Sequence, residues 1–238
     1  MGGFALVLAL FAVGGSSADD TPWIDLMKPD VWKKVDARWI ETDAVALDAA
    51  DRRKLIASKV EGGPIWVNGP GRTANLVTKV DYADCEIEIE FLIAGGSNAG
   101  VKFHGLYEIQ ILDTYGKSAD SLTGNSMGGI YPRARSGPPY GYLDDGTPPK
   151  VNAANKAGEW NRLTAIWKAP RLDADGNALE HGGVVRAELN GKLIHENATV
   201  KTPTGANWVL RNTGSGPLMF QADHGPTAIR KLRIRERK

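Results

Sequence analysis

The chain has 238 residues, and its 29 Lys and Arg residues nearly balance its 28 Asp and Glu residues, for a formal net charge of +1. This balance gives no basic surface of the kind that nucleic acids or anionic membranes attract, so neither is expected as a partner. Hydrophobic residues make up 42% of the chain and charged residues 24%, which is typical of a soluble globular protein.

The first expected element is a secretory signal peptide over residues 1–18. Phe4–Val13 is a short apolar run, and the small residues at 16–18 offer a cleavage site before Asp19. The segment before the run lacks Lys and Arg. A membrane anchor is the alternative, but the run is too short to span a bilayer comfortably. We therefore expect a secreted or periplasmic protein with no membrane span after cleavage, and a single domain over residues 19–238.

Most of the remaining chain is expected to form short strands, because apolar runs alternate with Gly, Pro, Asn and Asp. The only helical turn expected is at residues 48–55, DAADRRKL. The regular spacing of these turn-forming residues between short apolar runs predicts an all-β fold of two packed antiparallel sheets. The expected strands are Leu55–Val60, Ile65–Val67, Asn75–Lys79, Cys85–Ile93, Gly100–His104, Tyr107–Leu112, Gly128–Tyr131, Asn161–Lys168, Val184–Leu189, Lys192–Val200, Pro217–Gln221 and Ala228–Arg235.

Local signals add detail to this fold. Asn190 and Gly191 stand between two strand-like runs and predict a two-residue hairpin turn. Residues 173–177, DADGN, predict a plain turn, with a calcium loop as the alternative that lacks the closing Glu. Cys85 is the only cysteine, so it forms no internal disulfide, and it is expected to be a small buried hydrophobe rather than a reactive thiol.

The two strands that meet at Gly105 carry the first candidate site. Side chains alternate between the two faces of a strand, so Lys102, His104, Glu108 and Gln110 are expected to share one face. An ammonium, an imidazole, a carboxylate and an amide together suit a polar substrate such as a sugar. The alternative is an ordinary solvated outer face. The all-acidic stripe of Glu86, Glu88 and Glu90 is expected to be such a solvated face.

Further candidates lie at strand ends and in loops. His224 follows an apolar run and precedes a glycine, where it could approach a ligand or cap a turn. Asn155 could bind sugar hydroxyls, and Trp66 and Arg72 flank a turn and could equally be structural.

The irregular stretch at 117–159 is long enough to be functional. Tyr131, Tyr140 and Tyr142 in it could stack on a sugar ring. The chain has no nucleotide-binding glycine loop, zinc-ligand spacing or serine-nucleophile elbow.

The run SNAGVKFHGLYEIQILDTYG at 97–116 resembles the signature of the 3-keto-disaccharide hydrolase domain family. Three further segments fit in the same order: GGIY at 128–131, NAANKAGEWNRLTAIWKAPR at 152–171 and LMFQADHGPTAIRKLRIR at 218–235. The resemblance covers roughly residues 21–237. It implies a concanavalin A-like jelly-roll sandwich in a secreted or periplasmic protein. The implied substrates are glycosides already oxidised to a ketone at sugar carbon 3.

The resemblance also implies which residues form the site: Glu108, Gln110, Asp113, Asn155 and His224. Lys102 and His104 lie inside the motif at positions that are expected to vary, so they could tune specificity. The chain departs from the family pattern in three places. The Tyr-, Pro- and Gly-rich loop at 133–150 is longer than the expected loop or differs from it. Lys156 and Ala157 stand where members usually read Pro-Pro, and Ala222 is inserted before Asp223.

The expected mechanism follows from the implied ketone. An ordinary glycosidase needs two facing carboxyl groups, but Glu108 and Asp113 are an odd number of residues apart and should face opposite ways. A 3-keto sugar instead allows removal of the carbon 2 proton, β-elimination of the aglycone and hydration of the enone. His224 or His104 is the expected base, with Glu108 as its orienter or as the acid. Lys102 or a divalent metal ion would stabilise the enolate.

Two other classes of function remain open. A carbohydrate-binding module would use the same face, with the loop tyrosines and Trp66 as stacking platforms, and would not convert the saccharide. A structural cell-surface sandwich would bind no saccharide.

Overall fold

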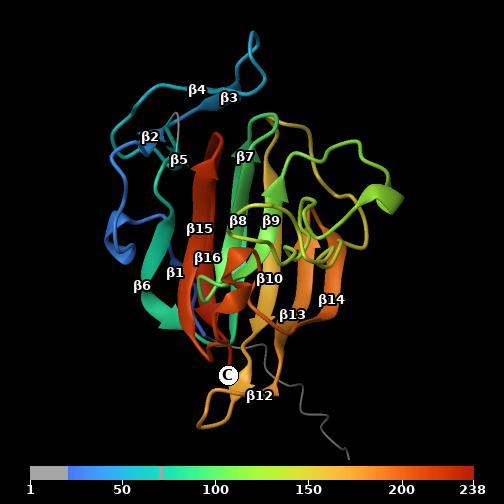
Figure 1. Ribbon diagram of the computed structural model, residues 1–238. Helices are drawn as coiled ribbons and strands as arrows, with labels where there is room; N and C mark the ends of the chain where they lie inside the picture. Colours follow the sequence, from blue (N-terminus) through green and yellow to red (C-terminus); the bar gives the residue numbers. More distant parts are fainter. Residues whose placement is uncertain (1–20, 70–71) are drawn as a thin grey trace, which may run out of the picture.

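A computed structural model describes residues 21–69 and 72–238, which form two antiparallel β-sheets packed face to face (Figure 1). The predicted signal peptide at 1–18 lies outside the described residues. The expected fold class, an all-β sandwich of the concanavalin A-like type, is confirmed.

The large sheet has eight strands and lies behind the small sheet in the view of Figure 1. Seven of its strands run in the order β14-β13-β10-β7-β16-β5-β2, and β1 pairs with β16 outside this path. The strands are β1 (Ile24–Asp25), β2 (Ile40–Thr42), β5 (Ile65–Val67), β7 (Cys85–Ile93), β10 (Asn161–Lys168), β13 (Gly182–Leu189), β14 (Lys192–Val200) and β16 (Thr227–Glu236).

The small sheet has four strands in the order β6-β15-β8-β9. Its strands are β6 (Leu76–Tyr82), β8 (Asn98–Phe103), β9 (Tyr107–Leu112) and β15 (Gly216–His224). The remaining strands form two isolated pairs, β3 (Val45–Leu47) with β4 (Leu55–Ala57) and β11 (Arg171–Leu172) with β12 (Ala178–Glu180). Three short 3-10 helices are η1 (Pro29–Val31), η2 (Ala119–Ser121) and η3 (Ala206–Val209).

The core fills the space between the two sheets, because each strand turns its alternate apolar side chains inward. Phe103 of β8 stacks on Trp167 of β10 with ring centroids 5.0 Å apart, which joins the small sheet to the large one. Both side chains are fully buried, and burial of such a side chain stabilises the fold by about 2–3 kcal/mol.

Several local predictions are confirmed. Asn190 and Gly191 have φ angles of 51° and 75°, as a two-residue hairpin turn requires, and they join β13 to β14. Residues 173–177 form a plain turn, in which an Asp173 carboxylate oxygen accepts the N–H groups of Asp175 and Asn177. Cys85 is buried in the core.

Two predictions about secondary structure are wrong. Residues 48–54 form the hydrogen-bonded loop of the β3–β4 hairpin rather than a helical turn, because the Asp48 N–H bonds back to the Lys54 carbonyl, and Leu55 begins β4. The segment 128–131 is not a strand. Only Ile130 makes β-bridges, to Ile109 and Thr147. This segment lies along the edge of β9 and forms hydrogen bonds with the backbone groups of that edge, but it does not extend the sheet as a strand.

The acidic stripe of β7 is also not the solvated face that was expected. Glu88 is buried, and its carboxylate accepts hydrogen bonds from Arg162 of β10 and from Lys231 and Arg233 of β16. Basic residues on the two flanking strands therefore neutralise the stripe. Tertiary pairing decides this, because the basic residues are more than 70 positions away in the sequence.

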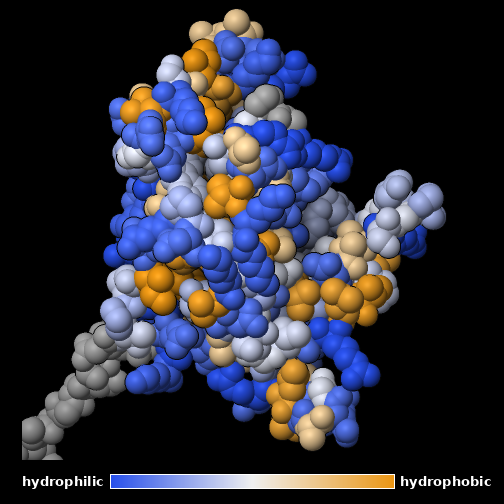
Figure 2. Space-filling view, turned by 90° about the vertical axis from the view of Figure 1, so that its left-hand side faces the viewer, coloured by the Kyte–Doolittle hydropathy of each residue, from blue (hydrophilic) through white to orange (hydrophobic). Residues whose placement is uncertain are grey.

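The surface of the molecule is mainly hydrophilic on the side shown in Figure 2, where hydrophobic side chains form scattered small groups rather than one broad patch. No helix among the described residues is long and apolar enough to cross a membrane.

Candidate functional site

The outward face of the small sheet carries a buried ion pair. Val101 and Phe103 of β8 point into the core, so Lys102 between them points outward, and the same alternation turns Glu108 of β9 outward. The two residues are direct cross-strand partners, and Lys102 Nζ lies 3.1 Å from Glu108 Oε2. Their side chains are only 17% and 3% exposed, so the pair is shielded from solvent.

The Glu108 carboxyl group is held in a low-polarity position. Its side chain lies against Gly100 of β8, where a Cβ atom would overlap Glu108 Oε1. Burial raises the pKa of Glu108, while the Lys102 ammonium acts in the opposite direction. Gly100 pairs with Gln221 of β15, and the charges of Asp223 and His224 at the end of that strand also act on the Glu108 carboxyl group. A carboxyl group with a raised pKa is suited to hold and transfer a proton.

The segment after β9 folds back and covers the edge of the sheet beside Gln110. The Gln110 N–H bonds to the Gly129 carbonyl, and the Gly128 N–H bonds to the Gln110 carbonyl. The Gln110 side chain is fully buried and donates to Asn125 Oδ1 at 2.6 Å. Gln110 therefore anchors the covering segment as well as lying next to Glu108 along the outward face.

Two tyrosines form the wall beside Glu108. The Tyr131 N–H bonds to the Glu108 carbonyl, and the Tyr131 hydroxyl lies 3.3 Å from that of Tyr142. Their rings meet edge to face, and Tyr142 is half exposed. Burial, the Tyr142 hydroxyl and the Glu108 charge all raise the pKa of Tyr131, so this phenol stays protonated as a hydrogen-bond donor.

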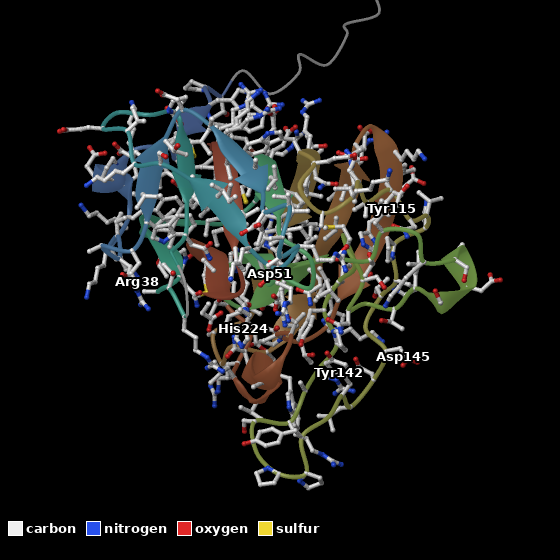
Figure 3. All side chains as sticks on the ribbon, turned by 90° about the horizontal axis from the view of Figure 1, so that it is seen from above. Arg38, Asp51, Tyr115, Tyr142, Asp145 and His224 are labelled. Atoms are coloured by element: carbon white, nitrogen blue, oxygen red, sulfur yellow. The ribbon has the colours of Figure 1, made fainter. Side chains whose placement is uncertain are left out.

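The end of β15 supplies a histidine with an acidic partner. His224 Nδ1 lies 2.7 Å from Asp223 Oδ1 and 3.1 Å from Gln221 Nε2. With Nδ1–H donating to Asp223, Nε2 keeps its lone pair and can act as a base. The His224 side chain is 43% exposed and so can be reached by a substrate. Figure 3 shows His224 and Tyr142 on the same side of the molecule.

The inserted Ala222 is accommodated by a bulge. Pairing between β15 and β8 shifts register between Gln221 and His224, and Ala222 points into the core. Its backbone N–H donates to the side chain of Asn75, and its carbonyl accepts from the side chain of Asn68. The departure from the family pattern is thus absorbed locally.

His104 does not share this face, so the prediction that four polar residues line one surface is wrong for it. His104 lies in the β8–β9 turn with a φ of 54°, which takes its side chain out of the strand alternation. It is buried, with Nδ1 3.0 Å from the Thr213 carbonyl, and Trp167 Nε1 donates to its Nε2 at 3.3 Å. Burial lowers the pKa of His104. It is part of the packing rather than a base open to substrate.

Four other predicted residues lie outside the cluster. Trp66 is buried and packs against Trp39 in the core, so it offers no stacking surface. The Asn155 side chain donates to the Trp160 carbonyl and stabilises the entry to β10. Arg72 is exposed on the loop before β6. Tyr140 is exposed, in the loop that the β-bridge between Ala134 and Tyr142 closes.

Asp113 follows the end of β9 and does not pair with Glu108, in agreement with the parity of the strand. Its carboxylate instead accepts a hydrogen bond from Arg52 Nη2 at 2.9 Å and one from the Gly96 N–H at 3.2 Å. It lines a separate cavity at the rim of the sheet.

Asp223, Gly100 and Thr204 were not identified from the sequence. Asp223 stands directly before His224 in the chain. An acidic residue next to a candidate catalytic histidine is a sequence signal that could have identified Asp223 as its partner. Gly100 and Thr204, whose hydroxyl accepts the Glu108 N–H, act through contacts made across the fold.

The described residues do not assemble a metal site from protein side chains. Among residues 21–69 and 72–238, no group of three or more His, Cys, Asp and Glu residues could hold a metal ion.

Comparison with known proteins gives one family match and several structural neighbours. The model of the 3-keto-alpha-glucoside-1,2-lyase-like domain matches residues 22–235. A candidate glycosyl hydrolase from Parabacteroides distasonis ATCC 8503 superposes with a TM-score of 0.59 at 26% identity, over 84% of each chain. A second one from this organism has a TM-score of 0.55 at 19% identity, over 91% of this chain and 100% of its own. No curated protein matches the chain.

Proposed function

Because the chain belongs to the 3-keto-alpha-glucoside-1,2-lyase-like domain family, which makes it a carbohydrate-active domain, we propose that it cleaves 3-keto-glycosides. We further propose that it does so outside the cytoplasm, after removal of residues 1–18. The neighbour at 26% identity, a candidate glycosyl hydrolase, supports glycoside cleavage. The carbon 3 ketone is the finer part of the proposal, and it rests on the family and on the chemistry of the site.

The reaction begins with removal of the proton on carbon 2, which the neighbouring ketone acidifies. His224 Nε2 accepts this proton, and Asp223 holds the ring through Nδ1. The C–H electron pair moves toward the ketone oxygen and forms an enolate. Lys102 supplies a positive charge for this oxygen, and the low exposure of the ion pair strengthens the interaction.

The enolate then collapses and expels the aglycone from carbon 1. The departing oxygen takes a proton from Glu108, because burial of this carboxyl group favours its protonated form and so raises its pKa. An enone with a carbon 1–carbon 2 double bond remains. Addition of water at carbon 1 and return of a proton to carbon 2 gives the free 3-keto sugar, so the overall reaction is hydrolysis.

The observation that carries the proposal is the convergence of a buried Lys102–Glu108 pair with the Asp223–His224 pair on one face of the small sheet. This set supplies a base, an acid and a charge for an enolate. Its second carboxylate, Asp223, holds His224 instead of serving as the nucleophile or base of a classical glycosidase.

The test is incubation of the full chain with 3-keto-trehalose and with a 3-keto-glucoside, with and without chelator, followed by mass spectrometry. Cleavage of the 3-keto compounds but not of the parent glycosides is the expected result. Equal cleavage of oxidised and parent glycosides would replace the elimination route by ordinary hydrolysis.

A carbohydrate-binding role without catalysis is the second candidate, and the half-exposed Tyr142 beside Tyr131 favours it. In that case the 3-keto substrate persists in every arm of the incubation while the saccharide still raises the melting temperature. A structural sandwich would show neither turnover nor a shift.

A further inference from the structure

A second cavity lies at the rim of the small sheet, where β9 ends, and is called the β9 cleft here. Its volume is about 510 Å³. Asp113, Tyr115 and Lys117 line it from the segment after β9, Lys156 lines it from the loop before β10, and Arg52 lines it from the β3–β4 hairpin. Three segments that are distant in the sequence therefore form one concave surface.

The β9 cleft carries excess positive charge. Three cationic side chains and one carboxylate line it, and the Asp113 carboxylate is already bound by Arg52 and by the Gly96 N–H. In the part of the chain that the structure describes, neither Lys117 nor Lys156 has a carboxylate within ion-pair distance. Both ammonium groups are thus available to an anionic ligand.

An aromatic ring accompanies these charges. The Tyr115 side chain is half exposed, and Lys156 Nζ lies 5.6 Å from the centroid of its ring. The Lys156 ammonium therefore lies over the Tyr115 ring, which brings a cation and an aromatic side chain together at a place that suits a sugar bearing a negative group. Tyr115 is labelled in Figure 3.

The cleft continues the candidate site along β9. Glu108, Gln110 and Leu112 share the outward face of this strand, and Asp113 follows directly. At a rise of about 3.3 Å per residue, Leu112 is about 13 Å from Glu108. Gln110 between them is covered by the segment that it anchors, so a saccharide whose reacting ring lies at Glu108 would enter the cleft by passing beside that segment.

We propose that the β9 cleft is a subsite for an anionic sugar residue in the leaving group of the substrate, recognised by its carboxylate or sulfate. This inference rests on the proposed function, because it places the leaving group next to the reacting ring.

The first arm of the test compares 3-keto-glucosides that differ only in the leaving sugar: glucose, glucuronate or a sulfated glucose. The full chain is expected to show kcat/KM about tenfold higher for the anionic leaving groups, since a charge-assisted hydrogen bond contributes on that scale. Preference for glucuronate alone would identify the carboxylate, and preference for both anions would identify charge in general. Equal kcat/KM for all three would overturn the proposal.

The decisive variant carries both Lys117→Ala and Lys156→Ala. Its ratio of kcat/KM for anionic to neutral leaving groups is expected to fall toward one. Lys192→Ala, an exposed lysine on β14 of the other sheet, is the matched control and should keep the wild-type ratio. A preference that survives the double variant would assign it to another surface.

A binding arm separates the two proposals. An unoxidised glucuronate-containing disaccharide is titrated calorimetrically into wild type and the double variant. If no 3-keto compound is cleaved but the disaccharide binds only to wild type, the proposed function fails and the cleft stands. If the 3-keto compounds are cleaved and the disaccharide binds to neither protein, or binds equally well to both, the proposal for the cleft fails and the proposed function stands.

Discussion

The Glu108 side chain lies across the backbone of Gly100 on the neighbouring strand, in space that a Cβ atom would occupy. The absence of a side chain at Gly100 therefore lets Glu108 reach Lys102 Nζ at 3.1 Å. A glycine inside a strand weakens the strand, and here it coincides with the charged pair of the candidate site.

Gly100→Ala is expected to lower kcat/KM for a 3-keto-glucoside by at least about tenfold, because the methyl group displaces Glu108 from Lys102. Steady-state kinetics measure the effect. Gly137→Ala is the matched control, since its Cβ would meet nothing within 4 Å, and it should behave as wild type. Unchanged kinetics in Gly100→Ala would show that the position of Glu108 does not matter for the reaction.

Asp223→Asn is expected to lower kcat by roughly 10²–10⁴-fold with little change in KM, because an amide no longer selects the tautomer of His224 with Nε2 free. Asp223→Glu should recover part of the loss, and imidazole should rescue His224→Ala. His181→Ala, at an exposed histidine just before β13, is the control and should retain full activity. A loss in Asp223→Asn that appears only as reduced melting temperature would make Asp223 structural.

Glu88→Gln is expected to lower the free energy of unfolding by about 2 kcal/mol, because it removes the buried carboxylate that hydrogen-bonds to three partly exposed cations. Burial opposes ionisation of this group, yet hydrogen bonds from Lys231, Arg162 and Arg233 lower the pKa of Glu88 to about 2. Its contribution to stability is therefore present above the ordinary value near 4.5 and is lost as the pH falls toward 2. Urea unfolding at pH 7 and pH 3 measures both effects.

Glu90→Gln on the same strand is the control for Glu88→Gln. Its partner Arg230 is 43% exposed, so the loss should be about 1 kcal/mol or less. Equal losses in the two variants would mean that burial of Glu88 adds nothing to its ion pairs.

His104 should make the fold sensitive to mild acid. Burial lowers the pKa of His104 from its ordinary value of 6.5, so the unfolded chain binds more protons than the folded protein as the pH falls below that value. Stability should therefore decline from pH 7.5 to pH 5. His104→Asn, which tolerates the positive φ of 54°, should decline less steeply in urea unfolding.

His195 and Glu108 also contribute to the pH dependence of the free energy of unfolding. Burial also lowers the pKa of His195, so some acid sensitivity should persist in His104→Asn. Burial raises the pKa of Glu108, which makes stability fall as the pH rises above 4.5 and so acts in the opposite direction. Parallel pH profiles in wild type and His104→Asn would show that His104 keeps the same proton affinity in both states.

The sequence predicted most of the strands, since ten of the twelve expected segments overlap long or central strands of the two sheets. Periodicity alone could not predict that residues 128–131 would bind along the edge of β9 through turns and a single bridge residue. It also could not distinguish a solvated acidic stripe from one neutralised by neighbouring strands, because Arg162 and Arg233 reach Glu88 only after β7, β10 and β16 have paired.

By itself, the sequence determined the all-β class, the family and the outward direction of Lys102, Glu108 and Gln110, because the two-residue period of a strand is a local property. Only the tertiary structure decided which polar residues meet. The positive φ in the β8–β9 turn directs His104 into the packing beside Trp167, whereas the bulge in β15 brings Asp223 and His224 toward Glu108. Backbone angles and strand register place these side chains, and both depend on contacts between residues far apart in the chain.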